Sequence, residues 1–339
     1  MPKIHHILII RLSAMGDVAM TIPVLKVFRD QYPDVELSVI TKPFFKPIFQ
    51  TIPNCNIVLV DTKSKHKGVL GLWKLSRELR HLKFNAIADL HNVLRSKILR
   101  VFLTGKHSAV IDKGRQEKRA LINKSNFIQL KSTHQRYADV FEQLGFPIDI
   151  NDVRFSAKAE LRSEYIEVIG DAPLKWVGIA PFAAFKGKEY PSELMAEVIA
   201  HLSNDHKILL FGAGQEEINQ LQLWQDQFEN VINLAGVFNL KQELDIISNL
   251  DVMLSMDSGN GHLAAMLGIP VVTLWGVTHP FAGFLPFNQP IDSALLSDST
   301  RYPKIPTSIY GNKLPEGYEN VMSTITPDQV ISKIKSYLE

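Results

Sequence analysis

A cluster of polar residues follows an apolar run near residue 256 and has the composition of an anion-binding turn. Its members are Asp257, Ser258, Gly259, Asn260, Gly261 and His262. A short helical pattern follows the turn, and the N-terminus of a helix offers free N–H groups and the positive end of the helix dipole. The glycines let a bulky anion approach the backbone. The pattern therefore predicts a site for a nucleotide diphosphate. The alternative is an ordinary strand–helix corner, capped by Asp257 and Ser258, with His262 serving only the packing.

A carboxylate occupies a similar position near the N-terminus. Asp17 follows the apolar run Ile7–Ile10 in a glycine-containing turn that opens a helical pattern. A carboxylate at the end of a strand can accept a proton from a substrate hydroxyl. The alternative is that Asp17 only caps the helix that follows.

Two further strand ends carry candidate ligand-binding residues. Lys188 lies in a loop after an apolar run, where a flexible cationic side chain suits a diphosphate, and Lys186 is an equal candidate by charge. Glu216 follows Gly212-Ala-Gly214, where a glutamate can accept hydrogen bonds from ribose hydroxyls. Taken singly, the lysines also fit a plain surface role, and Glu216 fits a first-turn helix acid without a ligand.

The elements that position these residues alternate between strand and helix patterns, which predicts parallel sheets covered by helices on both faces. At 339 residues the chain is long for a single core, so we expect two domains. The alternation of strand and helix patterns stops between Phe146 and Glu160 and then resumes. We expect an N-terminal Rossmann-like domain over residues 1–155, a second over 156–325, and a C-terminal helix over 326–339 that packs back on the first domain.

In such a fold the candidate residues share one feature, which is that each falls at the carboxyl end of a predicted parallel strand. One is in the first domain and three are in the second, so we expect them to face a common cleft. A dehydrogenase is disfavoured, because the first strand is followed by one glycine and not by Gly-x-Gly-x-x-Gly. Gly212-Ala-Gly214 also lacks its third glycine.

Composition and charge indicate the compartment and the kind of partner that we expect for the protein. A single cysteine, Cys55, excludes an internal disulfide and fits a reducing compartment. No run of eighteen apolar residues and no signal-peptide core is present, so we expect a cytoplasmic protein. The net charge is +2, but Lys63–Lys131 holds 17 Lys and Arg against 4 Asp and Glu, a surplus of +13. Such a surplus favours an anionic partner, namely a phosphorylated acceptor, an anionic membrane or nucleic acid; a solvated basic face is the alternative.

Two long segments resemble the signatures of the ADP-heptose:lipopolysaccharide heptosyltransferases, glycosyltransferase family 9. The first is Ile7-Leu-Ile-Ile-Arg-Leu-Ser-Ala-Met-Gly-Asp-Val18, followed by Met20-Thr-Ile-Pro-Val-Leu25. The second is Asp257-Ser-Gly-Asn-Gly-His-Leu-Ala-Ala-Met-Leu-Gly-Ile-Pro-Val-Val272, followed by Trp275-Gly-Val-Thr-His-Pro280. The similarity extends over nearly the whole chain.

The resemblance implies a GT-B fold and an inverting glycosyltransferase that moves a sugar, heptose above all, from a donor such as ADP-heptose to a lipopolysaccharide-core or related glycolipid. It assigns Asp17 as catalytic base and gives the N-terminal domain to the acceptor and the C-terminal domain to the donor. The implied donor residues are Lys188, Glu216, Asp257, Ser258, Gly259, Asn260, Gly261 and His262. The segment Asp89-Leu-His91-Asn92 with Arg95-Ser96 resembles the family's acceptor-side segment. We expect the acceptor to be bound by Ser13, His91, Asn92, Arg95, Arg115, Lys118 and Arg119. No metal or other cofactor is expected, and the enzyme is expected to contact the cytoplasmic face of the inner membrane.

The chain departs from the family pattern at several positions. Ala183 and Ala184 stand where several members have hydroxyl residues, and Asn260-Gly261 is an unusual filling of the donor turn. The sugar and the acceptor therefore stay open. Two alternatives remain, a nucleotide-sugar epimerase on the same scaffold and a non-catalytic nucleotide-sugar or glycolipid binding protein. A nucleic-acid binder is disfavoured, because no aromatic residues are regularly interleaved with the basic ones.

Overall fold

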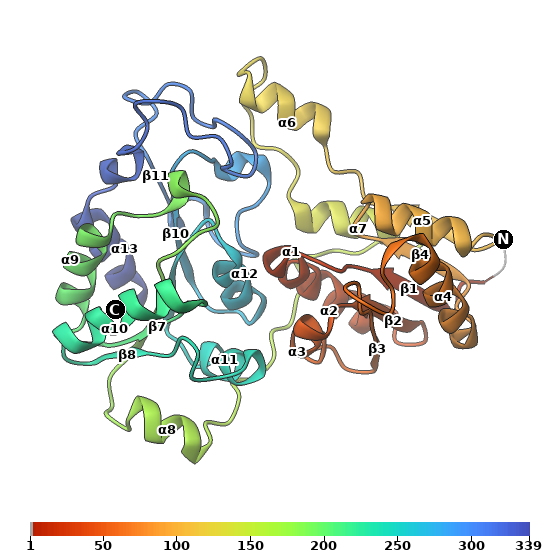
Figure 1. The fold of residues 1–339 in the computed structure, drawn as a ribbon, viewed down its shortest axis with the longest axis horizontal. Coiled ribbons are helices and arrows are strands. Elements are labelled where there is room, and N and C mark those ends of the chain that lie inside the picture. Colours follow the sequence, from red (N-terminus) through yellow and green to blue (C-terminus); the bar gives the residue numbers. More distant parts are fainter. Residues whose placement is uncertain (1–2) are drawn as a thin grey trace. The chain divides into compact units, whose positions relative to one another are not determined.

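The computed structural model describes residues 3–339 and divides into two compact units (Figure 1). Unit 1 contains the chain up to Lys113 together with Thr133–Arg154. Unit 2 contains Gly114–Ser132 and Phe155–Glu339. The chain thus passes from unit 1 to unit 2 for the last time between Arg154 and Phe155.

Unit 1 is built on a parallel sheet of five strands in the order β3-β2-β1-β4-β5. The central strand β1 is Ile-rich and completely buried, as expected for a strand covered on both faces. The strands are β1 (His6–Ile10), β2 (Glu36–Thr41), β3 (Cys55–Leu59), β4 (Ala86–Asp89) and β5 (His107–Val110).

Helices cover both faces of this sheet. α4 and α5 pack on each other and on the side chains of Leu8, Ile10 and Ile87. α2 and α7 pack together outside that cluster, where the rings of Phe28 and Phe141 lie 4.9 Å apart. The helices are α1 (Met15–Ala19), α2 (Thr21–Gln31), α3 (Lys46–Phe49), α4 (Gly68–Leu79), α5 (Leu94–Phe102) and α7 (Thr133–Gln143).

Unit 2 is built on a parallel sheet of six strands in the order β11-β10-β9-β6-β7-β8. Its four inner strands are fully buried. The strands are β6 (Trp176–Ala180), β7 (Lys207–Leu210), β8 (Val231–Asn233), β9 (Val252–Met256), β10 (Val271–Trp275) and β11 (Ala294–Leu296).

Helices also lie on both faces of the second sheet. α9, α10 and α13 share one apolar core with Leu254 and Met256 of β9. Ser255 points to the opposite face, where its hydroxyl accepts a hydrogen bond from the backbone N–H of Gly261 in α12. The helices are α6 (Arg115–Ile122), α8 (Ser163–Ile169), α9 (Ser192–Leu202), α10 (Gln215–Gln227), α11 (Leu240–Ile247), α12 (Gly259–Met266) and α13 (Pro327–Leu338).

The final helix differs from expectation. We expected it to pack back on the N-terminal domain, but α13 packs within unit 2 against α9. Its buried side chains Val330, Ile331 and Ile334 belong to the core of that unit. The helix begins as its sequence indicates, because the Thr326 hydroxyl accepts a hydrogen bond from the N–H of Gln329.

The segment Gly114–Ser132 also differs from expectation, since it groups with unit 2 and not with the N-terminal domain. Its basic residues from Arg115 to Arg119 lie in α6. Leu121 and Leu130 pack against Ala282, and the N–H of Leu130 donates to the carbonyl oxygen of Phe281 at 2.9 Å. The basic surplus of Lys63–Lys131 is consequently shared by the two units.

None of the helices between residues 3 and 339 combines the length and the apolarity needed to cross a bilayer.

Candidate active-site residues

Strand order places the candidate residues where each sheet reverses the direction of its winding. In unit 1 the chain runs from β1 out to β3 and then returns to the other side of β1 with β4. In unit 2 it runs from β6 out to β8 and returns to the other side of β6 with β9. Open α/β sheets bind ligands at the carboxyl ends of the two strands that flank such a reversal. The polar turns that follow β1, β4, β6 and β9 are therefore the first places to look for a site.

The reversal point of unit 1 holds an ion pair between Arg11 and Asp17. Arg11 follows β1 and is buried, and its Nη2 contacts Oδ2 of Asp17. Its Nη1 donates to the carbonyl oxygen of Leu90 after β4 at 2.7 Å, so one guanidinium joins the two strand ends. The backbone N–H of Ala14 also lies 3.4 Å from Oδ2 of Asp17. Asp17 thus caps α1, as the alternative interpretation has it, and in addition is oriented by an arginine.

The other carboxylate oxygen of Asp17 is accessible. The side chain is 34% exposed, and Oδ1 makes no hydrogen bond with any residue of the described chain. The main-chain oxygen of Asp17 is held by the hydroxyl of Tyr137, which donates to it at 3.3 Å. The residue therefore has a fixed backbone, one occupied oxygen and one oxygen open to a substrate.

Asp89 organises the turn after β4. Its Oδ1 accepts hydrogen bonds from the N–H groups of His91 and Asn92 at 3.0 and 2.8 Å. Its Oδ2 lies 3.0 Å from Nε of Arg100, as an ion pair whose geometry is not that of a hydrogen bond. Asn92 adopts a positive φ of 44°, and its Nδ2 donates to the carbonyl oxygen of Ile111. The Asn92 amide group is thus used by the fold, whereas we expected it on the acceptor side.

His91 is the buried polar side chain of this turn that is left without a hydrogen bond. It is 7% exposed, and its Nδ1 has no partner among residues 3–339. Burial lowers the pKa of His91 to about 3, and the positive charges of Arg11 and Lys113 act in the same direction, whereas Asp17 opposes them. The ring is therefore neutral near pH 7 and offers an acceptor or donor nitrogen without a charge.

Ser13 and Arg95, the other expected acceptor-side residues of unit 1, are both half-buried. Ser13 sits between Arg11 and α1. Arg95 is in the first turn of α5, near enough for its charge to lower the pKa of His91. The structure thus brings Asp17, His91 and Arg95 into one electrostatic environment.

The reversal point of unit 2 holds a second ion pair. Nζ of Lys188, in the loop after β6, lies 3.0 Å from Oδ2 of Asp257, in the turn after β9. Each side chain is 12% exposed, so the pair is largely screened from water but remains accessible. The hydroxyl of Thr278 after β10 donates to the same carboxylate oxygen at 2.9 Å. Asp257 therefore ties the loops of three adjacent strands together.

The loops around Lys188 are packed backbone to backbone. The N–H of Val277 donates to the carbonyl oxygen of Gly187 at 3.0 Å, and a Cβ at Gly276 would lie 2.1 Å from that oxygen. Gly311 has a φ of 79°, and a Cβ there would lie 2.3 Å from Cδ of Lys188. Gly311 therefore leaves the space that the Lys188 side chain occupies, and Gly276 allows the close approach of its loop to the Gly187 backbone.

Lys186, the equal candidate by charge, has a different environment. Its side chain is 88% exposed and forms an ion pair with Glu189 three residues later. An exposed pair of this kind contributes little and does not fix the side chain. The geometry favours Lys188 over Lys186 as the oriented cation.

The N-terminus of α12 differs from the expected cap. Ser258 is the N-cap residue, but neither its side chain nor that of Asp257 accepts a hydrogen bond from the first turn. Asp257 turns to Lys188, and the Ser258 hydroxyl lies 3.1 Å from that of Ser255. The half-buried first residues, Gly259 and Asn260, thus keep N–H groups that no side chain caps.

His262 and Glu216 occupy contrasting positions. His262 is buried in α12, at 8% exposure. Glu216 is exposed in the first turn of α10, after β7, the strand adjacent to β6. The turn before α10 is closed by the next residue instead, since the Glu217 carboxylate accepts from the N–H of Ala213 at 2.8 Å. Glu216 therefore has no structural task that competes with a ligand.

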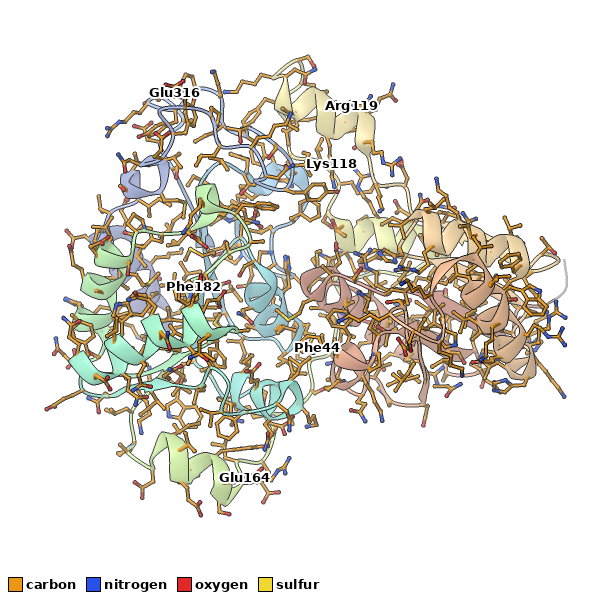
Figure 2. All side chains as sticks on the ribbon, in the orientation of Figure 1. Phe44, Lys118, Arg119, Glu164, Phe182 and Glu316 are labelled. Carbon is orange, nitrogen blue, oxygen red and sulfur yellow. The ribbon has the colours of Figure 1, made fainter. Side chains whose placement is uncertain are left out.

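The three basic residues expected on the acceptor side around position 117 lie on α6, in unit 2. Figure 2 labels two of them, Lys118 and Arg119. Lys118 is buried, with Nζ 4.1 Å from the centre of the Phe284 ring, and its charge is used in a cation–π contact. Arg115 and Arg119 are exposed. Lys118 is thus a packing residue of α6.

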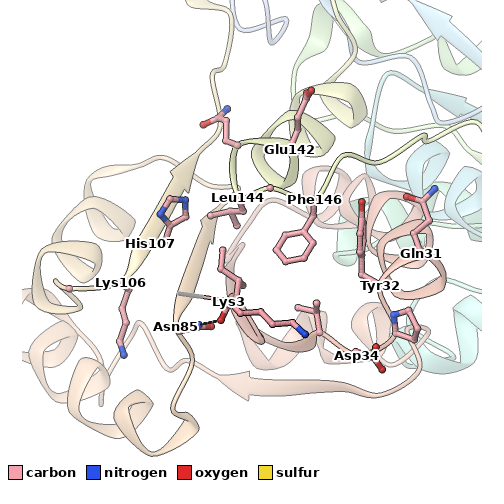
Figure 3. A pocket seen from close by; sticks show the side chains of 16 residues that line it. Lys3, Gln31, Tyr32, Asp34, Asn85, Lys106, His107, Glu142, Leu144 and Phe146 are labelled. Atoms are coloured by element: carbon pink, nitrogen blue, oxygen red, sulfur yellow. Dashed lines mark hydrogen bonds between the residues drawn. The ribbon is translucent and has the colours of Figure 1, made fainter. Parts of the chain in front are cut away.

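A cavity of about 780 Å³ lies at the opposite, amino edge of the unit 1 sheet (Figure 3). Its lining includes Lys3, Tyr32, Asn85, His107 and Phe146. None of the expected site residues contributes to it. We therefore place the chemistry at the carboxyl edge, where the oriented charges are. Within residues 3–339, no group of three or more His, Cys, Asp or Glu side chains is arranged to hold a metal ion.

We did not predict several residues of these sites from the sequence. Arg11 orients Asp17, Thr278 holds Asp257, and Gly311 makes room for Lys188. Arg11 and Thr278 lie inside the two signature segments, so the resemblance to the family could have pointed to both residues. Gly311 lies in a loop of irregular sequence, and only the fold brings it to Lys188.

Two doubly wound parallel-sheet units, each with polar turns at its reversal point, are the architecture of the GT-B fold. The sequence profile of glycosyltransferase family 9 (heptosyltransferase) matches residues 72–304. The chain belongs to this family and is a glycosyltransferase.

Named relatives and solved structures agree with this assignment. The chain is 29% identical over 286 residues to the lipopolysaccharide core heptosyltransferase OpsX of Haemophilus influenzae, covering 80% of this chain and 79% of that protein. A glycosyltransferase family 9 structure from Veillonella parvula has a TM-score of 0.77 at 21% identity, covering 98% and 97% of the two chains. The ADP-heptose lipopolysaccharide heptosyltransferase II of Escherichia coli has a TM-score of 0.70 at 20% identity, covering 98% of each. The predicted GT-B fold is confirmed.

Proposed function

We propose that this glycosyltransferase is an inverting heptosyltransferase that uses ADP-heptose and acts on a lipopolysaccharide-core acceptor at the cytoplasmic face of the inner membrane. The names of its relatives support the sugar and the acceptor class, since OpsX is a lipopolysaccharide core heptosyltransferase. The observation that carries the chemistry is Asp17, which has one oxygen paired with Arg11 and the other open at the reversal point of unit 1.

Asp17 acts as the general base in this mechanism. Its open Oδ1 takes the proton of the attacking acceptor hydroxyl, whose oxygen forms a bond to the anomeric carbon of the donor. The bond from that carbon to the phosphate oxygen breaks, and ADP leaves with the electron pair from the opposite face. A single displacement of this kind inverts the anomeric configuration. The role of Arg11 is positioning, because its guanidinium holds Oδ2 and leaves Oδ1 to point elsewhere.

Negative charge grows on the departing diphosphate, so stabilisation is needed there. Lys188 has three N–H donors and uses one on Asp257, which leaves two for phosphate oxygens. The uncapped N–H groups at Gly259 and Asn260 add the positive end of the α12 dipole. These groups supply the stabilisation from the chain itself, and no metal ion is required by this scheme.

The remaining donor contacts follow from strand order. Glu216 is in the first turn of α10, which follows β7, the strand adjacent to β6, and its exposed carboxylate suits the ribose hydroxyls. Asp257 is a positioning residue for Lys188. We assign Ser258, Gly261 and His262 to the same donor turn. Ala183 and Ala184 lie in the loop after β6, the strand that pairs with β9.

The acceptor is assigned to the reversal point of unit 1. The neutral ring of His91 offers a hydrogen bond to a sugar hydroxyl, and Arg95 offers a charge to an acidic or phosphorylated group. Ser13 lies in the same turn as Asp17. Arg115 and Arg119, exposed on α6 of unit 2, remain proposed cationic residues for an acidic acceptor.

The test is a transfer assay with purified protein, ADP-heptose and lipopolysaccharide truncated before its heptoses. ADP release is expected only when donor and acceptor are both present, and NMR of the product is expected to show an inverted anomeric centre. Conversion of the donor without acceptor would instead identify an epimerase. Donor binding without turnover on any truncated acceptor would identify a binding protein. Melting-temperature shifts with ADP-, UDP- and GDP-sugars select the donor beforehand.

A further inference from the structure

The outward side of α4 is apolar at its N-terminal end. Val69, Leu70 and Trp73 are 55%, 82% and 47% exposed. Their spacing of one and four positions places them on one side of the helix, while Leu72 and Leu75 on the other side are buried in the unit 1 core. Three large apolar side chains together in water are unusual for a surface helix, and such a patch marks an interaction site.

α5 adds to the same surface. Leu94 and Val101, seven positions apart, are 74% and 66% exposed. α4 and α5 pack on each other over one face of the sheet, and their inward residues belong to one core cluster. Because both helices cover the same face of the sheet, their outward sides point in the same direction. We call this outward surface the α4–α5 face.

Basic residues surround these apolar side chains. Lys67, Lys74 and Lys97 are exposed, and none of them forms an ion pair within the described chain. The guanidinium of Arg77 lies 5.2 Å from the centre of the Trp73 ring. An aromatic ring with apolar neighbours and a surrounding set of lysines matches the chemistry of a membrane interface, where rings sit among headgroups and cations attract anionic lipids.

Acidic residues are nearly absent from this part of the chain. Residues 63–106 contain 11 Lys and Arg against 2 Asp and Glu. Asp89 is completely buried, and Glu78 is paired with Lys65 and His66. A protein partner would meet uncompensated positive charge around an apolar centre. An anionic bilayer supplies both the negative charge and the apolar interior.

We propose that the α4–α5 face docks the enzyme on a bilayer that carries anionic headgroups, with Leu70 and Trp73 inserted at the headgroup level. This inference extends the proposed function, because a lipid-anchored acceptor is presented at such a surface. The binding itself requires neither donor nor acceptor, so it is measured separately from sugar transfer.

The first experiment uses the full chain and vesicles of phosphatidylcholine with or without phosphatidylglycerol. Co-sedimentation is expected only with phosphatidylglycerol and is expected to weaken with salt. Replacement of Lys67, Lys74 and Lys97 by Gln is expected to weaken it roughly 100-fold, at about fivefold for each lysine near an anionic surface. The matched control replaces Lys158, Lys304 and Lys313, three exposed lysines of unit 2, and is expected to bind as the wild type does. Equal loss in both triple variants would overturn the proposal, because it would indicate attraction by net charge alone.

The second experiment tests the apolar contact. Leu70→Ser with Trp73→Ser is expected to weaken vesicle binding roughly tenfold, whereas Leu223→Ser, at a 61% exposed position on α10, is expected to leave it unchanged. The fluorescence of Trp73 also reports directly on its contact with lipid, because Trp176, Trp224 and Trp275 are at most 9% exposed. Quenching by brominated lipids is expected in the wild type and is expected to disappear in Trp73→Phe.

Three further results would overturn the proposal. They are the absence of lipid quenching, vesicle binding that survives the Leu70→Ser/Trp73→Ser change, and a dimer in sedimentation velocity that this double change dissociates. The last result would assign the face to a second copy of the chain. Transfer to a detergent-solubilised acceptor is expected to persist in the double variant. Loss of vesicle binding with retained transfer therefore tests the surface, whereas failure of transfer in the wild type would count against the proposed function only.

Discussion

Nζ of Lys188 lies 3.0 Å from Oδ2 of Asp257 and joins the loop after β6 to the turn after β9. These two strands flank the reversal point of the unit 2 sheet. The carboxylate holds the ammonium group in place before any donor arrives, so less side-chain entropy is lost when a diphosphate binds. The pair is thus best understood as preorganisation of a cation.

Replacement of Lys188 by Gln is expected to reduce the affinity for ADP-heptose about 10- to 100-fold, the loss of a charge-assisted hydrogen bond. Isothermal titration calorimetry with the donor measures this. Lys186→Gln is the matched control, because Lys186 is two residues away but 88% exposed and paired with Glu189. A larger loss in Lys186→Gln than in Lys188→Gln would show that the wrong lysine has been assigned.

Gly311→Ala tests the space around the same lysine. The new Cβ would lie 2.3 Å from Cδ of Lys188, so the side chain must move away from Asp257. Gly317→Ala is the control, since Gly317 has nearly the same φ, 80° against 79°, with no atom within 4 Å of a Cβ. Both changes are expected to destabilise the protein by about 1–3 kcal/mol through backbone strain. Only Gly311→Ala is expected to weaken donor binding, which thermal melts with and without ADP-heptose measure.

Asp17→Asn removes the proposed base and keeps the shape of the side chain. Transfer is expected to fall by roughly two to four powers of ten, while donor binding stays unchanged. Single-turnover transfer and donor titration on the same preparation measure the two quantities. Wild-type transfer by this variant would remove Asp17 as the base.

The buried ring of His91 makes stability depend on pH. Its pKa is lowered to about 3 in the folded protein, chiefly by burial, against an ordinary value of 6.5. Below pH 6.5 the unfolded chain binds a proton that the folded chain does not, so the free energy of unfolding falls as the pH drops toward 3. The slope for one such group is about 1.4 kcal/mol per pH unit.

Denaturant unfolding at several pH values between 7 and 4 measures this slope. His91→Asn is expected to make it shallower, and His107→Asn, at an exposed position on β5, is expected to leave it unchanged. His279, whose pKa burial lowers to about 4, contributes in the same direction and remains in both variants. An unchanged slope in His91→Asn would mean that His91 takes up a proton as readily in the folded protein as in the unfolded chain.

Chelation provides a test of the expected metal independence. If Lys188 and the N-terminus of α12 carry the leaving group, EDTA is expected to leave the transfer rate unchanged. Addition of Mg²⁺ or Mn²⁺ after dialysis against the chelator provides the control. A rate that chelation abolishes and one of these ions restores would require a cation on the diphosphate.

The sequence predicted the fold class well, because its strands are short apolar runs that end in polar, glycine-containing turns. Strand β1 and the turn to Asp17 are examples. It could not provide strand order, since the same runs fit several crossover patterns. The position of Lys188 beside Asp257 depends on β6 and β9 being neighbours, although their sequences are far apart.

Other features were missed for local reasons. α6 has the sequence RQEKRALI, whose charges suggest a loop, and its helix is held by apolar contacts to distant residues such as Ala282. β11 has three residues, too few for a periodic pattern. The sequence could not show that the fold itself uses the Asn92 amide group. Its hydrogen bond to the Ile111 carbonyl oxygen depends on β4 and β5 lying side by side.

The assignment of Gly114–Ser132 to unit 2 restricts where the enzyme can be cut into separately folding fragments. Because this segment leaves unit 1 and rejoins it at Thr133, the N-terminal half is discontinuous in sequence. A fragment ending at Arg154 would carry α6 without the surface that covers Leu121 and Leu130. Such a fragment would be prone to aggregate, whereas one in which a short flexible linker replaces residues 114–132 would keep its own core intact. Any exchange of N-terminal domains between relatives must therefore move this helix with the C-terminal half.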